Sequence, residues 1–353
     1  MPYRSSVAAM TRPMRAVVLR RPGGPNALRV EWIPEPSPGV GESLIDVTLT
    51  GVNFDDLERC AGAQPELPLP AVLGVEAVGR RRSDGRRVVA LLRQGGGYAE
   101  VVAAREAHTV EIPAGIDDPQ ALGLFEQGST AYGALLLAGR LRAGESVAVS
   151  AAAGGVGHLA VQLAVALGAS PVIGLASTSV KRQFVTELGA DVVLDPADPE
   201  LADRVREAAG GTGVDLFVDS VGGAVARAAL VGLAPFGRLV CLGWRPGNSS
   251  DPGTGGTGDV TVGPEDPTGV VAVTTAQLAQ RSIGCAGFWM RHVVDDRELL
   301  CGIVDRLFAL ATQGQLTVHI DRTVALHEVG AAHAAVAARA TSGKVLIDVR
   351  REG

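Results

Sequence analysis

The sequence has few cysteines, few aromatic residues and no long run of apolar residues. Its four cysteines, Cys60, Cys241, Cys285 and Cys301, form no Cys-x-x-Cys pair, which excludes the usual spacing of a structural zinc site or a disulfide framework. We therefore expect reduced thiols in a cytoplasmic protein. No stretch approaches about 18 uncharged apolar residues, so no membrane-spanning helix is predicted. Aromatic residues are only 4% of the chain and glycines number 46, which favours closely packed helix-on-sheet layers.

The chain also lacks any stripe or block of basic residues, and its formal net charge is −6. This pattern argues against nucleic acid and against an anionic membrane as partners. Residues 1–13 contain no apolar segment of the kind that a secretion signal needs, and we expect them to form a flexible N-terminal extension. The length of 353 residues suggests about two domains, at roughly 150 residues each.

The spacing of apolar residues differs between two parts of the chain. Between about residues 14 and 105, short apolar runs separated by glycine and proline predict a β-rich domain. Beyond about residue 129, strand-length apolar runs alternate with helical periodicity, which predicts an α/β domain with a doubly wound parallel sheet. The expected strands of the sheet are 146–150, 171–176, 191–194, 214–218, 238–242 and 283–289. The expected helices are 156–167, 179–188, 201–209, 224–233, 297–313 and 327–340, and a last strand is expected at 343–349.

A glycine-rich turn joins the first of these strands to the helix after it. The turn reads Ala153-Gly154-Gly155-Val156-Gly157. Gly154 and Gly155 allow the backbone to approach a pyrophosphate, Gly157 allows the helix to pack against the strand, and the helix N-terminus attracts the anion. A strand, a glycine turn and a helix in this order predict a dinucleotide site. The alternative is a tight strand–helix packing that binds no ligand.

The end of the second strand indicates which dinucleotide binds. An NAD site usually has an acidic residue about 20 positions after the glycines, which binds the ribose 2′-hydroxyl. Here the segment contains Ser177, Thr178, Lys181 and Arg182, and no acid. Hydroxyl and ammonium groups would bind a 2′-phosphate, so the sequence favours NADPH, with Ser177 and Lys181 as phosphate ligands. The alternative is that Lys181 and Arg182 are only solvent-exposed charges at the start of a surface helix.

Taken together, these residues resemble the medium-chain dehydrogenase/reductase superfamily, and within it the zinc-free, NADPH-dependent quinone oxidoreductase (zeta-crystallin-like) branch. The likeness extends over nearly the whole chain from Met14. Besides the glycine turn, the matching motifs are 51–56, 73–79, 97–100, 128–132, 218–223 and 339–344. The resemblance implies a Rossmann sheet inserted in a β-rich GroES-like catalytic domain. It assigns 14–128 and 290–353 to the catalytic domain and 129–289 to the NADPH-binding domain.

The resemblance also implies roles for individual residues. In this branch the residues that match Asn53 and Thr130 lie beside the nicotinamide amide, and we assign both to the catalytic site. Arg339 matches an arginine that reaches the 2′-phosphate in some members. Gly243 and Phe288 match cofactor-binding positions.

Zinc-dependent relatives have a cysteine where this chain has Asn53, and a histidine where it has Val75. A catalytic zinc needs about three protein ligands with lone pairs, so no metal is expected. His327 and His333 are six residues apart, whereas a metal-binding helix spaces its histidines by four, so we interpret both as helix surface. Glu58 replaces the active-site tyrosine of the branch, and Glu126 adds an acid near Thr130.

A metal-free site cannot polarise an isolated carbonyl group strongly, so the easiest hydride acceptors are those that delocalise the arriving charge. We therefore predict hydride transfer from NADPH to a quinone or another α,β-unsaturated carbonyl compound. Two alternatives remain open: an enoyl-thioester reductase, and a non-catalytic NADPH-binding sensor or structural protein. A homodimer is expected, because the apolar strand 283–289 lies at the sheet edge in this family and pairs with its twin. The glycine-rich loop 247–258 is expected to cover the pocket.

Overall fold

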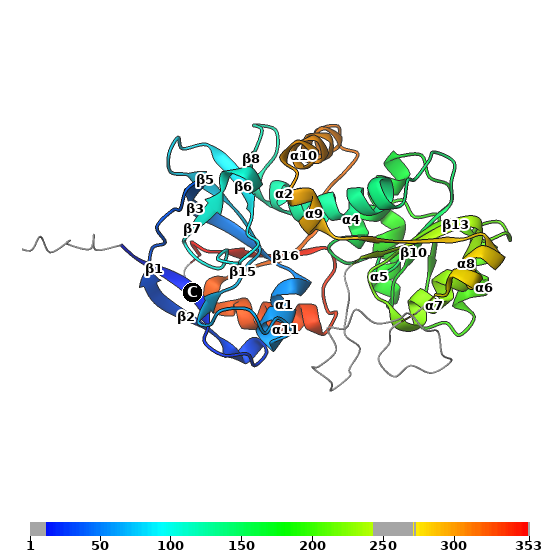
Figure 1. The fold of residues 1–353 in the computed structure, drawn as a ribbon, viewed down its shortest axis with the longest axis horizontal. Helices are drawn as coiled ribbons and strands as arrows, with labels where there is room; N and C mark the ends of the chain where they lie inside the picture. Colours follow the sequence, from blue (N-terminus) through cyan, green and yellow to red (C-terminus); the bar gives the residue numbers. More distant parts are fainter. Residues whose placement is uncertain (1–11, 243–270, 272, 352–353) are drawn as a thin grey trace, which may run out of the picture. The chain divides into compact units, whose positions relative to one another are not determined.

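The computed structural model describes residues 12–242, 271 and 273–351 (Figure 1). Two compact units are present: Met1–Leu122 together with Ile320–Gly353, and Gly123–His319. Most of the expected N-terminal extension, Gly243 and the loop 247–258 lie outside the described residues. Within the described ranges, no helix is both long enough and apolar enough to cross a membrane.

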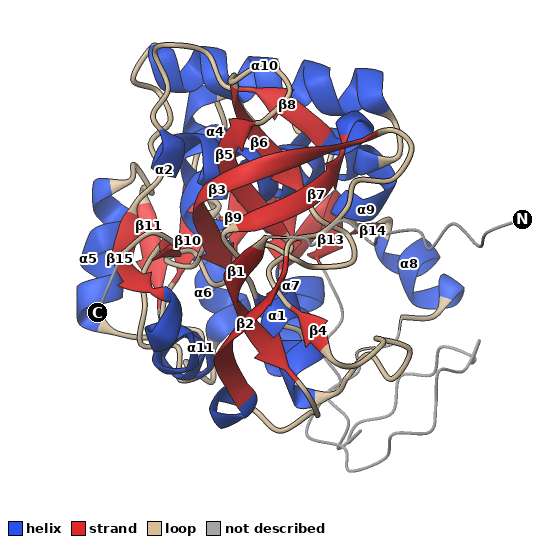
Figure 2. Cartoon of the chain, turned by 90° about the vertical axis from the view of Figure 1, so that its left-hand side faces the viewer, coloured by secondary structure: helices blue, strands red, loops and turns tan. Residues whose placement is uncertain are grey.

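The first unit is rich in β-structure, as its short apolar runs predict. Its larger sheet has the order β15-β16-β3-β5-β6-β8, with β7 paired to β3, and its smaller sheet has the order β2-β1-β4 (Figure 2). The strands are β1 (Pro13–Leu19), β2 (Leu28–Pro34), β3 (Glu42–Val52), β4 (Ala71–Val72), β5 (Glu76–Arg81), β6 (Arg87–Leu91), β7 (Val101–Arg105), β8 (Thr109–Glu111), β15 (Ile320–Ala325) and β16 (Lys344–Asp348). Helices α1 (Phe54–Ala61) and α11 (Val329–Ala337) contact each other.

Strand β16, red in Figure 1, comes from the C-terminal end of the chain and pairs with β3 from the N-terminal part. The register is antiparallel and places Leu346 opposite Gly51. Because Val345 and Ile347 are buried in the same apolar cluster as Ile45 and Val47 of β3, the two ends of the chain share one core. This sheet therefore brings residues near position 50 close to residues near position 345.

The second unit contains the predicted parallel sheet. Its order is β11-β10-β9-β12-β13-β14, and every neighbouring pair is parallel. The strands are β9 (Val147–Val149), β10 (Val172–Leu175), β11 (Val192–Leu194), β12 (Val214–Asp219), β13 (Leu233–Leu242) and β14 (Gly284–Phe288). The crossover helices are α4 (Gly157–Ala166), α5 (Ser179–Glu187), α6 (Leu201–Ala208) and α7 (Gly223–Gly232), and α8 (Thr275–Arg281) precedes β14. The doubly wound α/β fold is confirmed.

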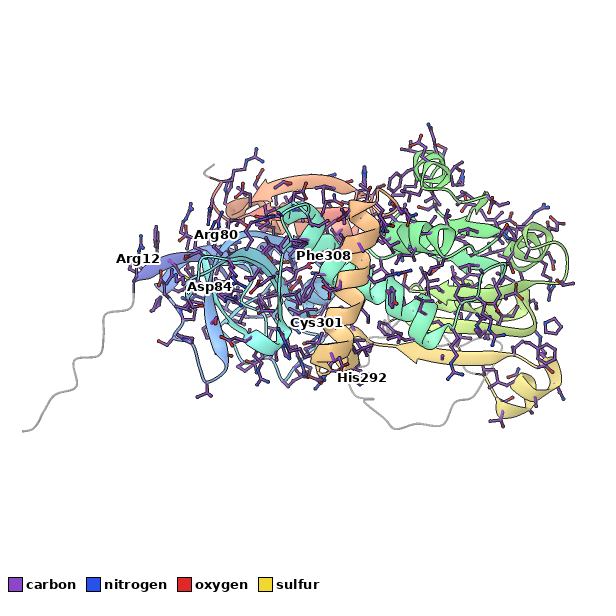
Figure 3. The ribbon with its side chains drawn as sticks, turned by 90° about the horizontal axis from the view of Figure 1, so that it is seen from above. Arg12, Arg80, Asp84, His292, Cys301 and Phe308 are labelled. Carbon is purple, nitrogen blue, oxygen red and sulfur yellow. The ribbon has the colours of Figure 1, made fainter. Side chains whose placement is uncertain are left out.

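A run of helical segments leads into this unit. Helix α2 (Asp118–Gly123) is followed by a π-helical segment (Leu124–Gly128), by α3 (Ser129–Tyr132) and by a second π-helical segment (Gly133–Ala138). Helix α9 (Met290–Val294) precedes α10 (Arg297–Thr312), which contacts α3 and carries Cys301 and the buried Phe308 (Figure 3).

Residues 290–319 therefore group with the second unit, whereas the sequence-based division assigned them to the catalytic domain. The reason is the packing of α10 on α3. That division into domains stays a prediction whose borders differ from those of the compact units.

Candidate cofactor and hydride-transfer site

The glycine turn between β9 and α4 leaves no room for a side chain at Gly157. The turn starts at Ala151, which adopts a left-handed backbone with φ 46°, and the Ala151 carbonyl accepts a hydrogen bond from Gly154 N at 2.8 Å. A Cβ on Gly157 would lie 2.8 Å from both Ala151 C and Ala152 Cα. These are backbone atoms that cannot rotate away, so a glycine is required here. The turn has the shape that a pyrophosphate needs at a helix N-terminus.

A buried histidine supports the turn from the helix side. His158 Nδ1 lies 2.9 Å from the Gly154 carbonyl oxygen, and His319 N donates to His158 Nε2 at 3.1 Å. Because Nε2 accepts a hydrogen bond, the ring proton lies on Nδ1, which donates to Gly154. The imidazole therefore joins the turn to residue 319. Sequence reasoning missed this role, because nothing local to His158 indicates a partner 161 residues away.

An acidic residue after β12 orders the neighbouring loop. Asp219 is 3% exposed, and its Oδ1 accepts from Ser150 Oγ at 2.6 Å. It also accepts from the backbone N–H groups of Val221 at 3.0 Å and Gly222 at 2.9 Å. Since Ser150 directly follows β9, this carboxylate holds together the carboxyl ends of two adjacent strands, where doubly wound sheets bind their ligands.

The predicted 2′-phosphate region lies at the start of α5. Thr178 is the N-cap residue, and its Oγ1 accepts from Lys181 N at 3.2 Å. Ser177 is exposed and Lys181 is half-buried. Arg182 points elsewhere, because its guanidinium pairs with Asp195 at 3.0 Å. Lys181 stays the predicted phosphate ligand.

We predict that Lys181→Ala weakens NADPH binding by roughly tenfold and leaves NADH binding almost unchanged, since a charge-assisted hydrogen bond contributes about 1.5–3 kcal/mol. Fluorescence titration with both cofactors measures the two affinities. The control is Gln183→Ala on the same exposed helix, which should alter neither affinity. Equal losses for NADPH and NADH in Lys181→Ala would contradict the assignment.

Thr130 lies in α3, between the two π-helical segments. The Oγ atoms of Ser129 and Thr130 are buried and have no hydrogen-bond partner among the described residues. Burying a hydroxyl without a partner is unfavourable by about 1–3 kcal/mol, so these atoms suit a ligand that offers polar groups. The π-helical turns on either side of α3 are of a kind that occurs frequently at functional sites. Gly133 lies about one helical turn after Thr130, and the ring of Phe288, at the end of β14, packs on it. A Cβ at Gly133 would lie 2.8 Å from Cε1 of Phe288.

In the first unit, Asn53 belongs to a buried polar cluster. Its Nδ2 donates to Glu76 Oε1 at 2.7 Å, and Lys344 Nζ donates to Asn53 Oδ1 at 2.9 Å. Lys344 Nζ also forms an ion pair with Glu76 Oε1. The exposed fractions of Asn53, Glu76 and Lys344 are 9%, 0% and 2%. Sequence reasoning named Asn53 and assigned no role to its two partners.

A second buried network lies behind Asn53. Asp56 accepts from Asn53 N at 3.0 Å and from Gly74 N at 2.9 Å. Burial, together with the nearby charge of Asp55, raises the pKa of Asp56 to about 7. The same network includes the Tyr98 hydroxyl, whose pKa rises well above its usual value because of burial and the Asp56 charge.

The Tyr98 hydroxyl also lies 3.0 Å from His333 Nε2, and burial lowers the pKa of His333 to about 4. His333 is fully buried, so its interpretation as helix surface is wrong. His327 is exposed, as expected.

The structure thus places the predicted site residues in two groups. The second unit contains Thr130, Ala153–Gly157, Ser177, Lys181 and Phe288, of which the glycine turn, Ser177 and Phe288 lie at or just after the carboxyl ends of strands. Asn53 and Arg339 belong to the first unit. Arg339 is exposed just beyond α11, with φ 55°. Gly243 lies outside the described residues.

The residues present do not fit the zinc site of metal-dependent relatives. Val75 offers no donor atom, and the Lys344 ammonium lies 2.9 Å from the oxygen of Asn53. A cation at this place repels a second cation. Within the described part of the chain, no group of three or more His, Cys, Asp or Glu side chains could hold a metal ion. Independence from metal stays a prediction.

Comparison with known proteins identifies the family. The family model of zinc-binding dehydrogenases matches residues 155–300. A quinone oxidoreductase of Pseudomonas aeruginosa is 33% identical over 334 residues, covering 92% of this chain and 96% of that protein. The chain belongs to the quinone oxidoreductase branch of the medium-chain dehydrogenase/reductase superfamily.

Solved structures of this branch agree with that assignment. Escherichia coli quinone oxidoreductase complexed with NADPH has a TM-score of 0.83 at 28% identity, covering 95% of this chain and 99% of that chain. Mycobacterial Rv1454c complexed with NADPH has a TM-score of 0.82 at 31% identity, with the same two coverages of 95% and 99%. The likeness to these quinone oxidoreductases spans both units, as the resemblance in the sequence implied.

Proposed function

We propose that the protein transfers a hydride from NADPH to a quinone or another α,β-unsaturated carbonyl compound, without a metal. The observation that carries the proposal is the glycine turn at Gly157, together with Ser177 just after β10 and Lys181 in the first turn of α5. Backbone N–H groups at a helix start suit a pyrophosphate, and hydroxyl and ammonium groups suit a 2′-phosphate. Two relatives of the same fold are complexed with NADPH.

Each predicted residue then has a defined task. The backbone of Ala153–Gly157 binds the pyrophosphate, and Ser177, Lys181 and Arg339 bind the 2′-phosphate. Asn53 and Thr130 each have the role beside the nicotinamide amide that the family resemblance implies, and the amide would give the Thr130 hydroxyl a partner, which it lacks among the described residues. Bound NADPH supplies the hydride. The protein contributes position and the exclusion of water, which are the main requirements of such a transfer.

The electrostatics of the first unit support conjugated acceptors. The buried cation near Asn53 is Lys344, and its charge is neutralised by Glu76. An ammonium group that is paired with a carboxylate in this way is a weak donor for polarising a plain ketone or aldehyde. Quinones and enones delocalise the charge that a hydride brings. A Burkholderia protein that is 30% identical over 349 residues is named 2-haloacrylate reductase, and an acrylate has a conjugated double bond.

The test is a turnover panel that follows NADPH oxidation. We expect activity with 1,4-benzoquinone or 9,10-phenanthrenequinone and none with acetaldehyde or, in reverse, with ethanol. Turnover of crotonyl-CoA alone would favour an enoyl-thioester reductase. Tight NADPH binding without turnover of any acceptor would favour a sensor or structural protein. Activity restricted to unconjugated carbonyls would contradict the proposal.

We also retain the homodimer and the cytoplasmic location as proposals. Strand β14 lies at one edge of the parallel sheet, where its backbone groups can pair with a second copy.

A further inference from the structure

The cluster of Asn53, Glu76 and Lys344 determines which way the Asn53 carboxamide faces. Its oxygen accepts from the Lys344 ammonium at 2.9 Å, and its nitrogen donates to Glu76 at 2.7 Å. A flipped carboxamide would point its N–H groups at an ammonium and its oxygen at a carboxylate. Each reversed charge-assisted bond disfavours the flipped form by roughly tenfold or more, and the two together by roughly a hundredfold.

The fold makes room for this ion pair at Gly51. A Cβ at Gly51 would collide with Glu76 Oε1 and with Cε of Lys344, so the pair occupies the space that a side chain would need. The three elements involved are β3, the start of β5 and the start of β16, which are neighbours in one sheet. The carboxamide is therefore held from two rigid strands.

Stability alone does not explain a buried ion pair of this kind. Well-packed apolar residues in place of such a pair are often as stabilising or more so. Here the pair is also incompletely satisfied, because Glu76 Oε2 is buried without a partner among the described residues. The geometry of the ion pair fits a role in orienting Asn53 better than a role in stabilising the core.

We propose that Lys344 and Glu76 are positioning residues that hold the Asn53 carboxamide in the one orientation competent for binding the nicotinamide amide. This inference rests on the proposed function, which places Asn53 beside that amide. Neither residue touches the reacting atoms. They act through Asn53, so their removal matters only while Asn53 is present.

A double-mutant cycle tests this dependence. Lys344→Met and Glu76→Gln are introduced together, because either change alone leaves a buried charge unpaired. With NADPH and 9,10-phenanthrenequinone, we expect Asn53→Ala and the pair variant each to lower kcat by roughly tenfold. The variant that combines all three changes should be no slower than Asn53→Ala. Multiplied losses, or a pair variant with the kcat of the wild type, would overturn the proposal.

The control is the exposed pair of Arg20, directly after β1, and Glu31 in β2, whose side chains are 2.6 Å apart. Arg20→Met with Glu31→Gln neutralises an ion pair in the same unit and should leave kcat unchanged. Thermal unfolding of every variant verifies that it is folded.

A readout independent of turnover separates this inference from the proposed function. In ¹⁵N-resolved NMR spectra, the side-chain NH₂ signals of Asn53, identified by their absence in Asn53→Ala, should exchange slowly with solvent. In the pair variant, exchange should be at least about tenfold faster. If the Asn53 signals exchange slowly but the protein turns over no acceptor, the proposed function is contradicted, whereas the fixed orientation of the carboxamide still holds. Fast exchange in the wild type would overturn the inference whatever the activity.

Discussion

Replacing Gly157 by alanine is expected to weaken NADPH binding by roughly a hundredfold, which corresponds to about 2.7 kcal/mol. In an ordinary helix this change would stabilise the protein by up to about 1 kcal/mol, because alanine restricts the unfolded chain. Here the added Cβ meets the backbone of Ala151 and Ala152 at 2.8 Å, so the whole glycine turn must shift. The N–H groups at the helix start then no longer converge on the pyrophosphate. Fluorescence titration with NADPH gives the loss directly.

The matched control is Gly302→Ala in α10. Gly302 is exposed in a helix, and a Cβ there would meet nothing within 4 Å. This variant should keep its NADPH affinity and raise the midpoint of thermal unfolding slightly. If Gly157→Ala binds NADPH as tightly as Gly302→Ala does, the turn is not the pyrophosphate site.

The second large effect concerns His333→Gln and the pH dependence of stability. Burial lowers the pKa of His333 from 6.5 to about 4 in the folded protein. A group with a lowered folded pKa contributes stability above its unfolded pKa and loses it as pH falls. His333 therefore makes the wild type less stable by roughly 3 kcal/mol as pH falls from 6.5 to 4. The glutamine variant lacks this loss.

Asp56 acts in the opposite direction in the same network. Its pKa is raised from 3.8 to about 7, so its contribution to stability is present at low pH and is lost as pH rises through 7. In the wild type the two titrations partly cancel between pH 4 and 6.5. In His333→Gln only the Asp56 titration remains. The free energy of unfolding of this variant should therefore fall steadily as pH rises from 4 to 6.5.

Urea unfolding at intervals of half a pH unit measures the free energies. The slope for the wild type minus that for His333→Gln should reach roughly +1.4 kcal/mol per pH unit. The control is His327→Gln, an exposed histidine close to the same helix. Parallel profiles for the wild type and His333→Gln would show that the buried imidazole does not titrate as proposed.

The sequence predicted the parts of the molecule that depend on neighbouring residues. Continuous apolar runs identified all six strands of the parallel sheet to within a few residues, except that β13 begins at Leu233 rather than near 238. The glycine turn was equally visible, because Gly154 and Gly157 occur at a fixed spacing between a strand and a helix. The two-residue strand β4 is too short to leave a periodic signal.

The buried polar groups were less visible. His333 lies in α11, whose sequence Val-Gly-Ala-Ala-His-Ala-Ala-Val-Ala has no polar face to reveal which side is buried. Lys344 and Asn53 are 291 residues apart, and no local pattern indicates that a lysine at the start of a strand will be buried against an asparagine. Contacts of this kind follow from the register of β3 and β16, which pair across nearly the whole length of the chain and which no local pattern specifies.

The pairing of β16 with β3 has a consequence for how the chain is made on the ribosome. At about 5–20 residues per second, Lys344 is synthesised roughly 15–60 seconds after Asn53. The residues of the parallel sheet, 147–288, are complete before that, so the second unit can fold while the first still lacks its final strand. Until β16 arrives, Glu76 has no ammonium partner and remains hydrated. The order of synthesis therefore allows the nucleotide-binding sheet to form first and requires the surroundings of Asn53 to be completed last.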